Sequence, residues 1–288
     1  MENQRVKALI KLLEDPNEIV YNAVEKALLK EDKHILPQLE LAWEKANSDI
    51  FHSRLNNIIH QIQFKTVKKE MHEWIASGAE DLLYGSYLVA KYRYYDLLFA
   101  SVNEQINSIW RDLRQTIKFC RTPIERVKCI NSVVFEKYNF SRNADNPASH
   151  RNNYINDVID SHKGNHITLS IIYVALCNRL NIPVRCVSLP KLLIMCYIDE
   201  KAIYDDELKS DSVLFYINAI SRGGVLGKKE VDVFLAQQGI TPHSRYYVPC
   251  SNVEVIRRLL VNLSYTYDLV GNAATVSEIE GLLKVFDN

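Results

Sequence analysis

The first third of the chain has the apolar spacing of amphipathic helices. Apolar residues recur at three- and four-residue steps from Val6 to Leu13 and again from Val20 to Leu28, which places each set on one face of a helix. Asp15-Pro16-Asn17 lies between them and predicts a break followed by a helix cap. Two further stretches, 35–46 and 51–64, have similar spacing, so we expect a helical N-terminal region.

A domain boundary is expected near Gly78. The segment Trp74 to Gly78 ends one helical pattern with a residue suited to a helix C-terminus, and Asp81 begins another pattern. We therefore divide the chain into a helical region, residues 1–78, and a second domain, residues 79–288.

The second domain changes from helical to mixed patterning. Residues 102–138 have helical spacing, and the polar run 139–152 predicts a long loop. A buried helix over 164–181 follows and ends before Pro183. Short apolar or β-branched runs then predict strands, and helical spacing returns near the C-terminus, which together indicate an α+β core with a small antiparallel sheet and C-terminal helices. The expected strands are 184–189, 192–198 and 213–217, and the expected helices are 228–238 and 252–267.

Composition excludes several classes of partner. The chain has 35 Lys and Arg residues and 35 Asp and Glu residues, so no overall field attracts nucleic acid or an anionic membrane face. The N-terminal segment lacks the pattern of a signal peptide, and no segment approaches the roughly 20 apolar residues of a membrane helix. We expect a cytoplasmic protein whose 6 scattered cysteines are reduced and mostly buried.

Several ordered motifs resemble those of a known family. The segments Lys163 to Ser170 and Ala175 to Val184 resemble the transglutaminase-like superfamily and, more narrowly, the SirB family of bacterial transglutaminase-like proteins. The segment Phe215 to Gly224 and the helix Arg257 to Leu263 continue the resemblance, which extends roughly from Asp81 to the C-terminus.

The N-terminal region carries a second, local resemblance. The stretch Leu9 to Ala23 is similar to one unit of a HEAT-type helical repeat, in which a pair of helices stacks on its neighbours.

The family resemblance implies a papain-type core with a cysteine at the start of a helix, a histidine on the following strand and an aspartate on the next. A helix start favours the thiolate, and the other two residues transfer the proton and orient the imidazole. The matching positions in this chain are His166, Leu192 and Asn218. Because none of the three has the side chain that the family's chemistry uses, the resemblance implies a degenerate triad and no catalytic residues.

We interpret the chain as a catalytically inactive scaffold or regulatory protein that binds a protein or peptide partner. We expect no cofactor, no metal, no nucleic acid and no membrane association. Three cysteines, Cys177, Cys186 and Cys196, are expected to be small buried hydrophobes rather than nucleophiles. The hydroxyls of Thr168 and Ser170 are expected to cap or pack.

An alternative stays open, in which His166 works in a hydrolase with a rearranged or metal-dependent site. His162 is four residues earlier and His150 is a conceivable third ligand, but Gly164 interrupts the helical spacing. The acidic cluster formed by Asp205-Asp206-Glu207 with Asp199 and Glu200 lacks the ligand spacing and turn glycine of a calcium loop, so a solvated hairpin is expected there.

Overall fold

The computed structural model describes residues 2–31, 33–46, 48–202 and 208–287. The chain forms two compact units, Met1–Glu73 (unit 1) and Trp74–Asn288 (unit 2), and the division falls inside helix α4, Asp49–Ala76. The predicted domain limits 1–78 and 79–288 differ from this division by a few residues, and as functional domains they stay a prediction.

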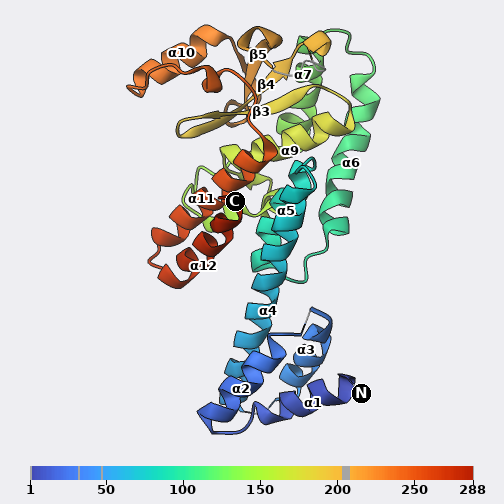
Figure 1. Ribbon diagram of the computed structural model, residues 1–288. Helices are drawn as coiled ribbons and strands as arrows, with labels where there is room; N and C mark the ends of the chain where they lie inside the picture. Colours follow the sequence, from blue (N-terminus) through green and yellow to red (C-terminus); the bar gives the residue numbers. More distant parts are fainter. Residues whose placement is uncertain (1, 32, 47, 203–207, 288) are drawn as a thin grey trace. The chain divides into compact units, whose positions relative to one another are not determined.

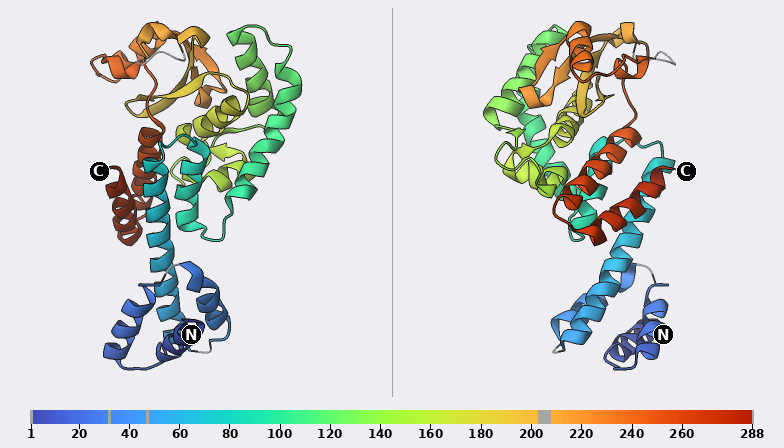
Figure 2. Two further views of the ribbon diagram at one scale, coloured as in Figure 1. Left: turned by 45° about the vertical axis from the view of Figure 1, so that its right-hand side comes forward. Right: turned by 90° about the vertical axis from the view of Figure 1, so that its left-hand side faces the viewer.

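Unit 1 is helical (Figures 1 and 2). It contains α1 (Glu2–Leu12), α2 (Glu18–Leu28), a short 3-10 turn (Lys33–Ile35), α3 (Leu36–Glu44) and most of α4. Their apolar stripes meet in one core, as the spacing predicts. The buried residues of this core are Val6, Ile10, Leu13, Val24, Leu28, Ile35, Leu39, Phe51, Leu55, Ile58, Ile59 and Ile62.

The break between α1 and α2 is held by side-chain contacts. Asn17 caps α2, because its side chain accepts a hydrogen bond from the backbone N–H of Ile19. The buried guanidinium of Arg54 donates to the carbonyl oxygens of Leu13 and Asp15. The predicted break at Asp15-Pro16-Asn17 is therefore confirmed.

Unit 2 has an α+β fold, as predicted. Its short strand pair β1 (Ser141–Arg142) and β2 (Lys163–Gly164) is parallel, and its main sheet is antiparallel with the order β3-β4-β5-β6. The main strands are β3 (Val184–Leu189), β4 (Leu192–Ile198), β5 (Val213–Asn218) and β6 (Gly224–Leu226). The helices are α5 (Leu82–Arg93), α6 (Phe99–Ile117), α7 (Pro123–Asn131), a π-helix (Ser132–Lys137), α8 (Ile155–Ser161), α9 (His166–Arg179), α10 (Lys228–Gln237), α11 (Asn252–Asp268) and α12 (Ala273–Leu283).

The described part of unit 2 also contains six short 3-10 turns, the last of which follows α12: His150–Asn153, Glu200–Ala202, Ser210–Ser212, Ala219–Ser221, Ser244–Tyr246 and Lys284–Phe286.

The main sheet is covered on both faces. Helix α9 packs against β3 and β4 (Figure 1), whereas Ile194 and Cys196 of β4 face a second core that includes Val231 and Leu235 of α10. Residues on both faces of β4 are buried, which explains why its sequence is continuously apolar instead of alternating.

Two helix limits differ from the sequence expectation. The helical pattern over 102–138 is interrupted, because Thr122 caps a new helix and Pro123 occupies its first turn. The helix expected from residue 164 begins instead at His166, after the cap residue Asn165. Strand β6 and helices α8 and α12 have no counterpart among the predicted elements.

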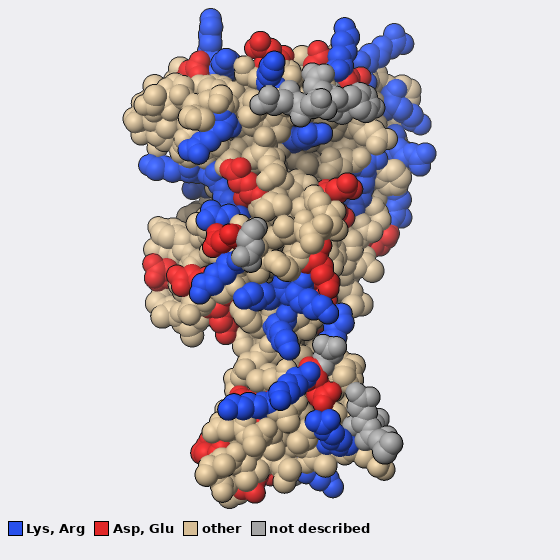
Figure 3. Space-filling model, viewed as in Figure 1, with Lys and Arg blue, Asp and Glu red and all other residues tan. Residues whose placement is uncertain are grey.

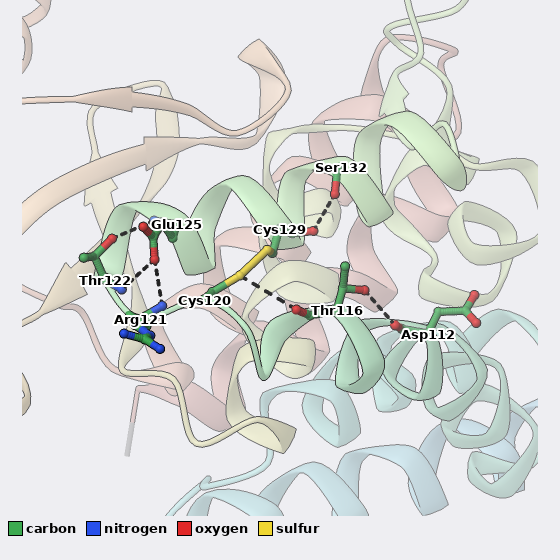
Figure 4. The surroundings of a disulfide bond; sticks show 8 residues. All are labelled: Asp112, Thr116, Cys120, Arg121, Thr122, Glu125, Cys129 and Ser132. Carbon is green, nitrogen blue, oxygen red and sulfur yellow. Dashed lines mark hydrogen bonds between the residues drawn. A yellow bond between two sulfur atoms is a disulfide. The ribbon is translucent and has the colours of Figure 1, made fainter.

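Two of the cysteines expected to be reduced are paired. A disulfide joins Cys120, after α6, to Cys129 of α7 (Figure 4). The turn between the two helices brings these residues together, although their spacing of 9 residues gives no recognised motif. The four free cysteines are Cys177, Cys186 and Cys196, which are buried, and Cys250, which is partly buried.

Charged residues of both signs are interspersed on the face shown in Figure 3, in keeping with the equal numbers of basic and acidic residues. Along the described residues, none of the helices combines the length and apolar character that crossing a bilayer requires.

Candidate functional site

The start of helix α9 is fixed by a reciprocal cap. The side-chain oxygen of Asn165 accepts hydrogen bonds from the backbone N–H groups of Ile167 (2.8 Å) and Thr168 (3.0 Å), and Thr168 Oγ1 lies 3.1 Å from the Asn165 backbone nitrogen, which donates to it. Gly164 precedes the cap, and a Cβ atom there would lie 2.7 Å from Thr168 Oγ1 and 2.8 Å from Val158. Glycine at position 164 therefore lets the backbone lie close to Val158 of α8 and Thr168 of α9, and Asn165 then caps α9.

His166 occupies the first position of α9. Its Nδ1 accepts a hydrogen bond of 2.9 Å from the backbone N–H of Leu193 on β4. Burial, reinforced by the positive charges of Arg258 and Arg142, lowers the pKa of His166 to about 3. At neutral pH the imidazole is therefore uncharged, and because Nδ1 is the acceptor, the proton is on Nε2.

The structure brings together two of the three positions that the resemblance identifies. His166 and Leu192, the first residue of β4, line one pocket of about 300 Å³, which we call the α9 pocket. Asn218, at the end of β5, does not line it; its side chain accepts a 3.0 Å hydrogen bond from the backbone N–H of Ile220, which does. The lining residues are Arg142, Asn143, Pro147, Ala148, Asn152, Gly164, Asn165, His166, Lys191, Leu192, Ile220, Asn262, Tyr265 and Thr266.

A buried asparagine holds two of the residues that line the α9 pocket. Asn153 is 0% exposed, and its side-chain oxygen accepts hydrogen bonds from the amide groups of Asn165 (2.8 Å) and Asn262 (2.7 Å). Its own amide donates to the carbonyl oxygen of His150 at 3.3 Å. One side chain thus connects a 3-10 turn, the cap of α9 and helix α11.

Its neighbour Asn152 holds the loop that covers this region. The Asn152 side chain donates to the carbonyl oxygens of Asn146 and Pro147 and accepts from Asn143. Since buried amides are costly unless they are hydrogen-bonded, these contacts fix the geometry of the pocket wall.

The hydroxyls near the start of α9 are engaged in structure. Thr168 and Ser170 are both 0% exposed. Thr168 Oγ1 donates to the Asn152 carbonyl oxygen at 2.9 Å, and Ser170 Oγ donates to the His166 carbonyl oxygen at 2.7 Å. Neither hydroxyl is directed to a proton acceptor of the kind that activates a nucleophile.

The free thiols lie away from the α9 pocket. None of the free cysteines lines it, and Cys177 and Cys196 are 0% exposed while Cys186 is 3% exposed. Burial raises the pKa of Cys177 and Cys186 well above the ordinary value, and the pKa of Cys196 and Cys250 to about 12. These groups are therefore neutral thiols at physiological pH.

The three histidines of the metal alternative have separate surroundings. His162 ends α8 in a left-handed conformation (φ 56°), with its ring centroid 4.7 Å from that of Phe140. His150 stacks on Tyr267, with a centroid distance of 4.9 Å. Because the helix starts after Gly164, His162 and His166 do not share one helical face, and no group of three potential ligands gathers within the described residues. Of the acidic cluster, residues 205–207 lie outside the described residues, whereas Glu200 forms an ion pair with Arg126 and Asp199 accepts a hydrogen bond from the backbone N–H of Lys201.

Several residues that form this site had no assigned role in the sequence. Asn152 and Asn153 come at the end of a polar stretch typical of a loop, and nothing in their sequence shows that both side chains are buried. Arg258 and Asn262 belong to a motif of the resemblance, which gave no function for either side chain. Arg258 donates to Ser188 Oγ and to the Leu189 carbonyl oxygen.

The comparisons with known proteins agree with the fold. The sequence model of the transglutaminase-like superfamily matches residues 100–261. Two UPF0162 proteins from Xylella fastidiosa strains Temecula1 and 9a5c are each 30% identical to this chain over 103 residues. The aligned part is 36% of this chain and 37% of each relative, so the chain spans little more than a third of their length. No solved structure matches significantly. Since the superfamily match covers more than half of the chain, including the start of α9, the chain belongs to the transglutaminase-like superfamily.

Proposed function

We propose that this protein is a catalytically inactive, SirB-type member of the superfamily that binds a protein or peptide partner in the α9 pocket. The observation that carries the proposal is the engagement of His166. At the position predicted for the nucleophile, its Nδ1 is occupied by a backbone N–H of β4, so the imidazole joins the helix to the sheet. A lone pair held in this way is withdrawn from proton transfer.

The surroundings of His166 support the same proposal. Leu192, at the position predicted for the general base, has no titratable group, and Asn218, at the position predicted for the orienting carboxylate, caps a turn instead. Loss of any one member of such a triad costs several orders of magnitude in rate, because the members act together. A pocket with these side chains is suited to binding a protein or peptide partner without converting it.

The helical unit 1 is proposed to add a second contact surface. Its helix pair resembles a HEAT-type repeat, and it exposes Ile19 (79%) and Ile50 (63%) to solvent. Isolated exposed apolar residues are common, so the α9 pocket is the stronger candidate for partner binding.

Measurements of amidase, transglutaminase and peptidase turnover test the proposal. The full-length protein is incubated with glutamine-containing peptides, with and without a primary amine, and ammonia release and peptide hydrolysis are measured. The expected result is no release above the buffer rate. Turnover that disappears when Cys177, Cys186, Cys196 or Cys250 is replaced singly by Ala would contradict the proposal.

A second candidate function is a hydrolase that uses His166. The observation that favours it is the neutral imidazole in the pocket wall, with Nε2 carrying a proton. The metal content of the purified protein and the turnover of His166→Ala separate the candidates. Stoichiometric metal, together with hydrolysis that His166→Ala abolishes, would favour the hydrolase. Metal-free protein, with the same background rate in the natural chain and in His166→Ala, would exclude the hydrolase function.

A further inference from the structure

The charged residues that line the α9 pocket have one sign. They are Arg142 and Lys191, and no Asp or Glu is among the lining residues. A neighbouring pocket of about 370 Å³, which shares Asn143 and Asn152 with it, is lined by Asp157 and Asp160 as well as by basic residues. The positive bias is thus a property of the α9 pocket and not of this whole side of the fold.

Both cations are available to a ligand. The Arg142 side chain is exposed and forms no hydrogen bond or ion pair with the residues that the structure describes. Lys191 Nζ has a neutral partner, the Gln238 side-chain oxygen at 3.3 Å, which leaves its charge uncompensated. An anion entering the pocket therefore meets positive charge that no carboxylate of the described chain neutralises.

A third positive charge lies behind the pocket wall. Arg258 is partly buried and donates to Ser188 Oγ (2.9 Å) and to the Leu189 carbonyl oxygen (2.6 Å), which are both neutral acceptors. Its field reaches the pocket, because it and Arg142 both disfavour a proton on His166. The Glu254 carboxylate, four residues earlier on α11, offsets part of this charge, and an anion in the pocket would stabilise the guanidinium further.

The neutral groups of the wall add hydrogen-bond donors. Asn165 and Asn262 each use one amide N–H on Asn153, so each retains a second N–H for another acceptor. The Asn165 oxygen, in contrast, is already occupied by the N–H groups of Ile167 and Thr168. With the Nε2–H of His166, the wall provides three N–H donors beside the two cations.

We propose that the α9 pocket is a carboxylate-binding site. It takes either an acidic side chain or the free C-terminal carboxylate of a peptide, held by the Arg142 guanidinium with help from Lys191 and the donors of the wall. Arginine is suited to this role, because its planar guanidinium matches the two oxygens of a carboxylate. The proposal rests on the binding function proposed above and specifies the chemistry of the bound group.

The experiment measures peptide binding to the full-length protein by NMR titration at low salt. Four short alanine-based peptides are compared: one with a single Glu and an amidated C-terminus, the same peptide with Gln, one with only a free C-terminal carboxylate, and a fully amidated peptide with neither. At least ten-fold tighter binding of one or both carboxylate peptides than of the neutral ones is expected. The preferred peptide identifies which source of carboxylate the pocket takes.

Substitutions test whether the preference for carboxylate peptides depends on Arg142. Arg142→Gln is expected to reduce the preference for the carboxylate at least five-fold, whereas Arg142→Lys retains part of it. Arg121→Gln makes the same charge change at another exposed position that does not line the pocket, and it should leave the preference unchanged. Thermal unfolding of each variant checks that the fold is intact.

Equal affinity for the Glu and Gln peptides together with equal affinity for the free and amidated C-termini would overturn the carboxylate assignment. An unchanged preference in Arg142→Gln would also overturn it, as would a pocket that binds inorganic phosphate but neither carboxylate peptide at the same concentrations. Hydrolysis of the peptides would contradict the proposed inactive function and not the carboxylate site, so the two failures are distinguishable.

Discussion

The start and the interior of helix α9 show two different uses of residues that enzymes employ in catalysis. At the start, His166 and Asn165 border a pocket and form hydrogen bonds to the surrounding backbone. In the interior, Cys177 is fully buried and its thiol is kept neutral by burial. The chain thus contains a thiol and an imidazole on the same helix, but the thiol has no access to the pocket. The two groups therefore differ in access, because the imidazole borders the pocket whereas the thiol is enclosed in the core.

The interior of α9 should be the more sensitive to truncation. Leu176 is 0% exposed, so Leu176→Ala removes buried methyl groups and leaves a cavity. We expect a loss of about 3 kcal/mol in the free energy of unfolding, as measured by urea denaturation. A loss below about 0.5 kcal/mol would show that this part of the helix is not tightly packed.

The start of α9 depends on polar contacts instead of apolar ones. Asn153→Ala removes the acceptor of two amide hydrogen bonds and leaves the Asn165 and Asn262 amides without it. We expect a loss of about 2 kcal/mol in the free energy of unfolding. The control is Asn178→Ala at an exposed position of α9, which should change the stability by less than about 0.5 kcal/mol. Equal effects of both changes would contradict the buried network.

The pH dependence of stability should report the neutral state of His166. Its pKa is about 3 in the folded protein and about 6.5 in an unfolded chain. Below pH 6.5 the unfolded state binds the extra proton, so this residue lowers stability as the pH falls. Between pH 7 and pH 5 the natural protein should lose about 2 kcal/mol more than His166→Asn, as measured by urea denaturation at both pH values. Parallel pH profiles would show that the imidazole titrates normally in the fold.

The thiols of the interior should be slow to react. Because burial raises the pKa of Cys177, Cys186 and Cys196, iodoacetamide at neutral pH should modify them in the native protein far more slowly than in urea. Unfolding without a reductant should expose the 4 free thiols, and adding a reductant should release the two that the disulfide holds. Rapid labelling of one buried cysteine in the native protein would point to an activated thiolate.

The sequence predicted the parts of the fold that local physics determines. The break at Asp15-Pro16-Asn17 and the apolar strands from Val184 to Ile198 were readable because caps and continuous burial leave a pattern in the neighbouring residues. The helix break at Thr122-Pro123 also had a local signal, but the apolar spacing on both sides obscured it.

The remaining features of the site depend on contacts between distant residues. Asn153 becomes buried because residues 165 and 262 approach it, and no pattern around position 153 shows that approach. In the same way, the disulfide depends on the path of the turn between α6 and α7. The resemblance supplied the positions of His166 and Leu192, whereas the charge of the pocket wall required the structure.

Intact-mass measurement of the full-length protein during incubation with a glutamine-containing peptide tests our proposal that the α9 pocket lacks a working nucleophile. Nucleophilic catalysis on this fold passes through a covalent acyl intermediate, which acid quenching preserves. We expect an unchanged protein mass at every time point. A mass increase equal to the acyl part of the peptide, mapped to His166 or to any free cysteine and absent when that residue is replaced by Ala, would contradict it.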